Sequence, residues 1–103
     1  MARTAIHPGE LLADELEERG VKPAHLAEAL GVNPSNVSRI IAGTQSVTAE
    51  MSLLLGAYFG QSDDVWLNLQ KLYDLDVARQ KEDVIAQLKH VIERRRKKEP
   101  ASF

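Results

Sequence analysis

The chain has 103 residues, a length typical of one small domain that buries about 60 to 65% of the surface of its unfolded chain. It has no cysteine, which excludes disulfide bonds and thiolate metal sites, and its net charge of −2 excludes a uniformly basic surface. No apolar run is long enough to span a membrane, and the first nine residues lack the apolar core of a signal peptide, so we expect a cytosolic protein without a membrane partner.

Charge is divided unevenly along the chain. Residues 1–76 carry five Lys and Arg against eleven Asp and Glu, a net charge of −6, whereas residues 77–103 carry eight against four, a net charge of +4. Between residues 29 and 49 the only charged residue is Arg39. We therefore predict a domain over 1–76, a basic amphipathic C-terminal helix over 77–98 and a disordered tail over 99–103.

The first predicted helix begins near Pro8 and stops at Gly20, because proline suits an early helical position and glycine suits a helix end. One side of it carries four carboxylates that repel one another by about a few tenths of a kcal/mol per pair: Glu10, Asp14, Glu17 and Glu18. A solvated face is the commoner explanation of such a row. The alternative is a site for a partner that compensates the charge.

Two short helices joined by a turn come next, from Pro23 to Leu30 and from about Pro34 to Ala42. Ala27 is small where the second helix has to cross the first, and Gly31 suits the position after a helix, where φ is usually positive. Asn33 before Pro34 is a typical helix start. An apolar seam sets the angle between the helices: Leu26, Leu30, Val32, Val37 and Ile40. This pattern predicts a helix-turn-helix, and DNA binding is its leading function.

The second helix of the pair would read DNA with the side opposite its buried residues. Arg39 suits a bidentate contact with guanine, while Ser and Asn side chains suit bases or phosphates. Thr44 and Gln45, just after the helix, suit a backbone contact. The alternative is that all of these are solvated polar residues. The predicted DNA contacts are Asn33, Ser35, Asn36, Ser38, Arg39, Thr44 and Gln45.

Two further helices complete the predicted domain, one over 49–59, which Thr48 caps, and one from Ser62 to about residue 76. Trp66, Leu69 and Tyr73 share one face of the latter, and this face is more apolar than so small a domain needs. Ordinary core and a dimer interface both explain it. A weakly charged DNA-reading surface favours two copies acting together, so we expect a homodimer.

From Val77 onward a narrow apolar stripe follows an otherwise charged segment, which predicts a helix of about 30 Å, too long to fold wholly against the domain. The fold class is therefore all-α, with five helices in the domain and an amphipathic helix after it. His7, His25 and His90 lack ligand spacing, and no nucleophile and base form a recognisable set. We expect no metal, no cofactor and no enzymatic activity.

The spacing of Ala27, Gly31, Val37, Ile40 and Gly43 resembles the Cro-like (XRE) helix-turn-helix family, which implies a phage-repressor-like fold. Two stretches outside this motif, His7 to Leu12 and Val65 to Leu75, resemble the HigA (VapI) antitoxins over about residues 6–76. The first positions of the reading helix depart from phage repressors, which often carry glutamines there, because this chain has Pro34 and Ser35. It also has Pro23 where relatives tend to have Gln.

The resemblance implies a repressor that binds a double-stranded DNA operator of its own operon and neutralises an RNA-cleaving toxin. Such a toxin is typically basic, so the acidic side of the first helix would suit it by charge. A stand-alone XRE-type regulator without a toxin is the first alternative. The second is a module that acts through the basic C-terminal helix on a protein, an RNA or an anionic membrane surface.

Overall fold

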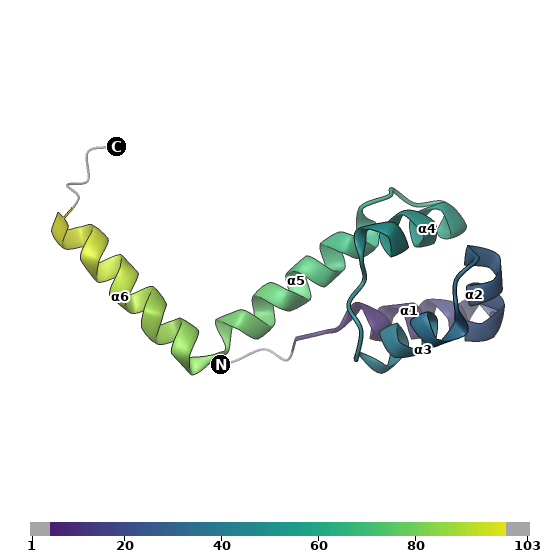
Figure 1. The fold of residues 1–103 in the computed structure, drawn as a ribbon, viewed down its shortest axis with the longest axis horizontal. Coiled ribbons are helices and arrows are strands. Elements are labelled where there is room, and N and C mark those ends of the chain that lie inside the picture. Colours follow the sequence, from purple (N-terminus) through teal and green to yellow (C-terminus); the bar gives the residue numbers. More distant parts are fainter. Residues whose placement is uncertain (1–4, 99–103) are drawn as a thin grey trace.

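The computed structural model describes residues 5–98, and all regular structure in this range is helical, as predicted. Six helices follow one another along the chain (Figure 1): α1 (Pro8–Arg19), α2 (Pro23–Leu30), α3 (Pro34–Ala42), α4 (Ala49–Phe59), α5 (Val65–Arg79) and α6 (Glu82–Lys98). The predicted disordered tail lies outside the described residues.

The count of five helices applies to the first part of the chain only, and the predicted boundary before the last helix is wrong. α5 continues to Arg79 instead of ending near residue 76, and α6 begins at Glu82 instead of near residue 77. The break falls at Gln80, which has φ −95° and ψ −5°. Neither glycine nor proline stands there, so the sequence carries no ordinary stop signal at the true break.

The molecule has two parts, which we name the body (residues 5–73) and the arm (residues 74–98). Helices α1 to α4 and the start of α5 gather in the body, while the end of α5 and all of α6 project from it (Figure 1). The chain measures 56 × 27 × 22 Å along its principal axes. Every buried residue lies in the body, and none of residues 74–97 is buried.

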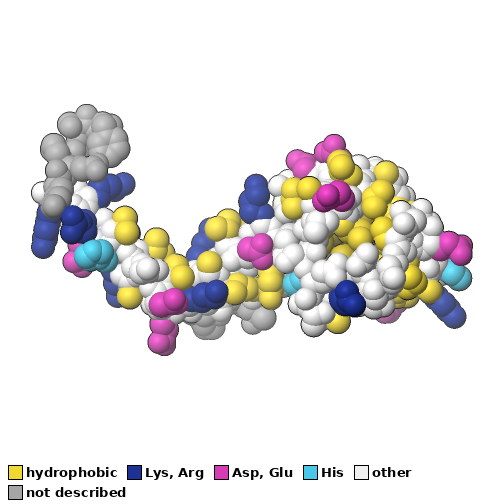
Figure 2. All heavy atoms as spheres, in the orientation of Figure 1, with side chains coloured by type: hydrophobic (Ala, Val, Ile, Leu, Met, Phe, Trp, Pro, Cys, Tyr) yellow, Lys and Arg dark blue, Asp and Glu magenta, His cyan; other side chains and the backbone are white. Residues whose placement is uncertain are grey.

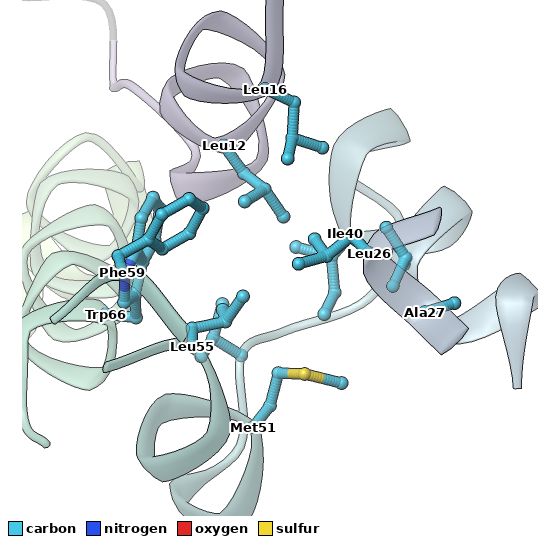
Figure 3. Close-up of a cluster of buried hydrophobic side chains, with 11 residues drawn as sticks. Leu12, Leu16, Leu26, Ala27, Ile40, Met51, Leu55, Phe59 and Trp66 are labelled. Carbon is cyan, nitrogen blue, oxygen red and sulfur yellow. The ribbon is translucent and has the colours of Figure 1, made fainter. Parts of the chain in front are cut away.

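One apolar core holds the five helices of the body together (Figure 3). Leu12 from α1, Leu26 from α2 and Leu55 from α4 are at most 1% exposed. Burial of each such side chain contributes about 1.5 to 3 kcal/mol relative to an exposed position. The full set of buried hydrophobic residues is Leu12, Leu16, Leu26, Ala27, Val37, Ile40, Val47, Met51, Leu55, Phe59 and Trp66.

A close backbone contact fixes α1 against α3. Gly9 lies so near the end of α3 that a Cβ atom there would stand 1.8 Å from the carbonyl oxygen of Ile40. No other amino acid fits without moving one of the two helices. The start of α1 therefore sets the position of the helix that is expected to read DNA.

Buried polar side chains join α5 to the rest of the body. Gln70 accepts a hydrogen bond from the backbone N–H of Val47 at 2.8 Å and donates to Asp74 at 3.0 Å. The hydroxyl of Ser52 accepts from the backbone N–H of Leu67 at 2.9 Å and donates to the carbonyl of Asp63 at 2.7 Å. Both side chains are almost fully buried, so losing either would leave buried backbone groups without partners.

Candidate nucleic-acid interface

The crossing of α2 and α3 has the geometry that the sequence predicted. Ala27 is 0% exposed in the core. Gly31 ends α2 with a φ of +73°, which a side chain would strain. The next residue, Val32, donates its backbone N–H to the carbonyl of Ala27 at 3.0 Å, which turns the chain toward α3. The two helices form a helix-turn-helix unit in the body.

Asn33 and Ser35 bond to each other at the start of α3. The side-chain oxygen of Asn33 accepts hydrogen bonds from the backbone N–H and from the hydroxyl of Ser35, both at 2.9 Å. Asn33 is thus the N-cap that the sequence predicted. Its oxygen is occupied, so its amide N–H₂ group remains to donate, while the Ser35 oxygen can accept.

The outward side of α3 is polar and carries a single charge. Val37 and Ile40 are 1% exposed and face the core. On the other side Ser38 and Arg39 are exposed, and Ser35 and Asn36 are half-buried. Arg39 makes no ion pair within residues 5–98, so its guanidinium can bind a guanine edge or a phosphate without first breaking a salt bridge.

The residues after α3 are partly committed to ending the helix. The backbone N–H of Thr44 donates to the carbonyl of Arg39 at 3.0 Å, and its hydroxyl donates to the same oxygen at 3.3 Å. To donate to a phosphate, the exposed Thr44 hydroxyl would have to give up this long bond. Gln45 is half-buried beside it.

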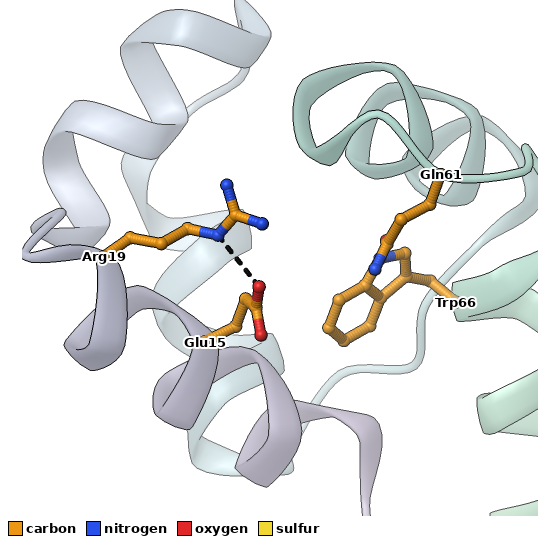
Figure 4. A network of polar contacts seen from close by, with 4 residues as sticks. All are labelled: Glu15, Arg19, Gln61 and Trp66. Atoms are coloured by element: carbon orange, nitrogen blue, oxygen red, sulfur yellow. Dashed lines mark hydrogen bonds and ion pairs between the residues drawn. The ribbon is translucent and has the colours of Figure 1, made fainter.

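Trp66, predicted for a dimer interface or for the core, lies in the core. It is 3% exposed, its ring centroid is 5.8 Å from that of Phe59, and its indole N–H donates to the side chain of Gln61 at 2.9 Å (Figure 4). Trp66 therefore packs in the core of one chain, as one of the two interpretations predicted. Its place at a dimer interface stays a prediction.

The two other residues of the predicted dimer face also turn toward the body. Leu69 is half-buried against the core, and the Tyr73 ring meets the His7 ring edge-on with centroids 4.8 Å apart. The exposed apolar residues of α5 are instead Leu72, at 56%, and Leu75, at 43%. Sequence periodicity showed that α5 has an apolar face, but both sides of the helix carry leucines and the pattern did not separate them.

The acidic row on α1 is exposed, but its members differ. Asp14, Glu17 and Glu18 face solvent. The Glu10 carboxylate accepts the backbone N–H of His7 at 3.3 Å while the His7 ring accepts that of Gly9 at 2.9 Å, a reciprocal cap of α1. Glu10 thus has a structural role that its place in the row did not indicate.

Arg19 and Glu15 form a further polar contact on α1 that sequence inspection missed. Their side chains are 2.8 Å apart (Figure 4). The Arg19 guanidinium also lies 4.8 Å from the centre of the Phe59 ring. Such a cation over an aromatic face contributes about 0.5 to 1 kcal/mol at an exposed site. Arg19 therefore covers the edge of the core at the end of α1.

Residues 5–98 offer neither a metal site nor a membrane-spanning helix. Within that range no group of three or more His, Asp and Glu side chains is placed to hold a metal ion. None of the described helices combines the length and apolar character needed to cross a membrane. The outward face of α3, with its polar side chains and one cation, is therefore the strongest candidate for a binding site in the body.

Comparison with known proteins shows the same unit elsewhere. Residues 12–66 match the helix-turn-helix family. The virulence-associated protein I of Dichelobacter nodosus is 44% identical over 77 residues, which cover 74% of this chain and 71% of that protein.

Two similar solved structures contain DNA. The antitoxin HigA of Pseudomonas aeruginosa, solved with the higBA promoter, is 40% identical with a TM-score of 0.77, and the match covers 84% of this chain and 94% of that one. A further protein of Pseudomonas aeruginosa, solved in complex with its operator DNA, is 41% identical with a TM-score of 0.79, covering 87% and 98%. The similarity thus extends well beyond the α2–α3 pair.

Proposed function

The chain belongs to the HigA (VapI) family of helix-turn-helix proteins, and on that basis we propose that it binds operator DNA as a transcriptional repressor and acts as an antitoxin. The observation that carries the proposal is the outward face of α3, polar and held at a fixed angle by Ala27 and Gly9. This function is non-catalytic and belongs in the cytosol.

Reading of the operator rests on α3 lying in the major groove. Arg39 reaches a guanine with two parallel hydrogen bonds, and Ser35 and Ser38 contact base edges or phosphates on either side of it. The N-cap residue Asn33 donates its amide to a phosphate, and Asn36, Thr44 and Gln45 flank the contact. No carboxylate lies between residues 29 and 49, so nothing on this face opposes the phosphates.

Mobility-shift titration with the promoter region of the chain's own gene tests DNA reading. Replacing Arg39 with Ala should weaken binding by about 1 to 3 kcal/mol and relax the preference at one base pair. Arg79→Ala is the matched control, because Arg79 is an exposed arginine on α5 whose ion pair within residues 5–98 is with its neighbour Asp76. Equal affinity and base preference for the Arg39 variant and the parent would remove Arg39 from the site.

Two copies of the chain bind one operator in this proposal, because a single face with one cation is a weak anchor. The half-sites should then lie about one DNA turn, roughly 34 Å, apart on a palindrome. A nuclease footprint measures this spacing directly. Protection of one isolated half-site would contradict binding as a dimer.

The proposed protein partner is a basic, RNA-cleaving toxin that contacts the acidic side of α1. Exposed Asp14, Glu17 and Glu18 support it by their charge, and the name of the similar HigA antitoxin supports it by function. A short neighbouring gene that encodes a basic protein would distinguish an antitoxin from a stand-alone regulator. Co-purification of that protein should be lost when Asp14 and Glu17 become Lys, while operator binding stays intact.

A further inference from the structure

His7 is the buried histidine of this chain. Its side chain is 7% exposed, whereas His25 and His90 are exposed. Figure 2 shows histidine surface on α6 and at the end of the body farthest from the arm. The function proposed above gives His7 no role, because a side chain enclosed in the body does not reach DNA. A buried histidine bonded through one ring nitrogen nevertheless depends on its own protonation state.

The protonation state of His7 follows from its place at the start of α1. Its Nδ1 atom accepts the backbone N–H of Gly9 at 2.9 Å. A ring nitrogen accepts a hydrogen bond only when it carries no proton, so this contact requires the neutral imidazole with its proton on Nε2. Protonation of Nδ1 would place a donor against a donor. The cap would then be lost, and the N–H of Gly9 has no partner within the first turn of a helix to replace it.

The same turn of α1 packs against the end of α3. A Cβ atom on Gly9 would stand 1.8 Å from the carbonyl oxygen of Ile40. A Cβ atom on Gly43, the C-cap of α3, would meet Cγ of the His7 ring at 3.8 Å, an ordinary van der Waals distance. Arg39, which we propose reads the operator, directly precedes Ile40. The backbone that carries Arg39 therefore lies against both Gly9 and the His7 ring.

His7 also contacts α5. Its ring meets that of Tyr73 edge-on, with centroids 4.8 Å apart and ring planes at 70°. The ring thus lies where the start of α1, the end of α3 and α5 meet. Two titratable side chains of the described residues face this position. The Glu10 carboxylate of α1 accepts the backbone N–H of His7 at 3.3 Å, and the Tyr73 phenol belongs to α5.

We propose that His7 is a positioning residue for operator binding, and that it holds the outward side of α3 in place only as the neutral imidazole. Acid protonates the ring, releases the N–H of Gly9 and loosens the start of α1 against the end of α3. The inference rests on the proposed function, because its consequence is read as operator affinity. It requires no contact between His7 and DNA.

The expected pH dependence has the opposite sign to that of a surface histidine. Protonation of exposed His25 or His90 adds a positive charge, which strengthens the attraction to phosphates. Protonation of His7 adds the same charge but also removes the cap on which the position of α3 depends. Operator affinity should therefore fall as the pH is lowered, although the chain becomes more positive.

Operator titrations at constant ionic strength between about pH 7.5 and about pH 5.5, the range in which histidine ordinarily changes charge, test the proposal. The parent should bind about threefold or more weakly at the lower pH. His7→Asn keeps a cap acceptor but does not titrate, so its affinity should stay within about twofold across the range.

His90→Asn is the matched control for this series, because it removes an exposed histidine and should keep the parental decline. Two results would overturn the proposal. One is a parent whose operator affinity stays constant or rises toward low pH. The other is a decline in the His7→Asn variant equal to that of the parent.

Magnetic resonance on the free parent chain separates this inference from the DNA-binding proposal and does not depend on how well a variant folds. At neutral pH the nitrogen shift of His7 Nδ1 should be that of an unprotonated ring nitrogen. As the pH falls, the amide signals of Gly9 and Gly43 should move together with the His7 ring. If the Gly43 signal did not follow, His7 would cap α1 without positioning α3, and the proposal would be wrong. Coupled signals in a chain that binds no operator at any pH would contradict the proposed function alone.

Discussion

The body and the arm carry similar hydrophobic residues but place them differently. In the body Leu12, Leu16, Leu26 and Leu55 are at most 2% exposed, whereas the leucine and the isoleucines of α6 are 38 to 50% exposed. The body is held by side chains from five helices, while α6 packs against its neighbour α5. The body therefore accounts for most of the stability of the chain, and α6 leaves its apolar side chains exposed.

Polar contacts follow the same division. In the body, Gln70 and Ser52 bond across elements to backbone groups 11 to 23 residues away. In the arm, the ion pair between Arg79 and Asp76 joins neighbours on one helix, and such exposed pairs contribute little. The two regions should consequently respond very differently to identical substitutions.

The largest expected difference comes from one substitution made in both regions. Leu55→Ala removes a side chain that is 0% exposed and should lower the free energy of unfolding by about 2 to 5 kcal/mol. Leu88→Ala, measured where the chain is monomeric, should change it by less than about 0.5 kcal/mol. Urea unfolding followed by circular dichroism measures both. Equal losses would mean that the arm belongs to the cooperative core.

Gln70 tests the junction between body and arm. Gln70→Leu keeps the volume but leaves the buried N–H of Val47 without an acceptor, so we expect a loss of about 1 to 3 kcal/mol in unfolding free energy. Asp74→Ala is the control, because it removes only the exposed acceptor of the Gln70 amide. If both variants unfolded at the same urea concentration, the bond to Val47 would have no special importance.

The smallest expected effects come from two threonines of the body, one of which should affect stability and the other operator affinity. Thr48 caps α4 by accepting the backbone N–H of Met51 at 3.2 Å, and Thr48→Ala should cost about 1 kcal/mol of stability without altering operator affinity. Thr44→Ala should instead lower operator affinity with little effect on stability, since the exposed Thr44 lies beside the side of α3 that we propose faces DNA. Thermal unfolding and mobility shifts on both variants check the crossed pattern. A loss of operator affinity in the Thr48→Ala variant would contradict this crossed pattern.

Local features of the sequence determined the helix-turn-helix. Helix ends at Gly20, Gly31 and Gly43 and the caps at Asn33 and Thr48 were all predicted, because capping and positive φ depend on residues within four positions of one another. The buried and outward sides of α3 followed from helical periodicity for the same reason.

Tertiary structure alone decided which polar and aromatic groups are inside. The sequence left Trp66 open between core and interface, and it gave no sign that Gln70 and His7 are buried. His7 meets Tyr73 across 66 positions of the chain, and Gln70 meets Val47 across 23. Such contacts depend on how whole helices pack, which periodicity within one helix does not encode. The break at Gln80 likewise came only from the folded chain, since helix-forming residues run through it, whereas the sequence had already predicted a last helix too long to fold wholly against the domain.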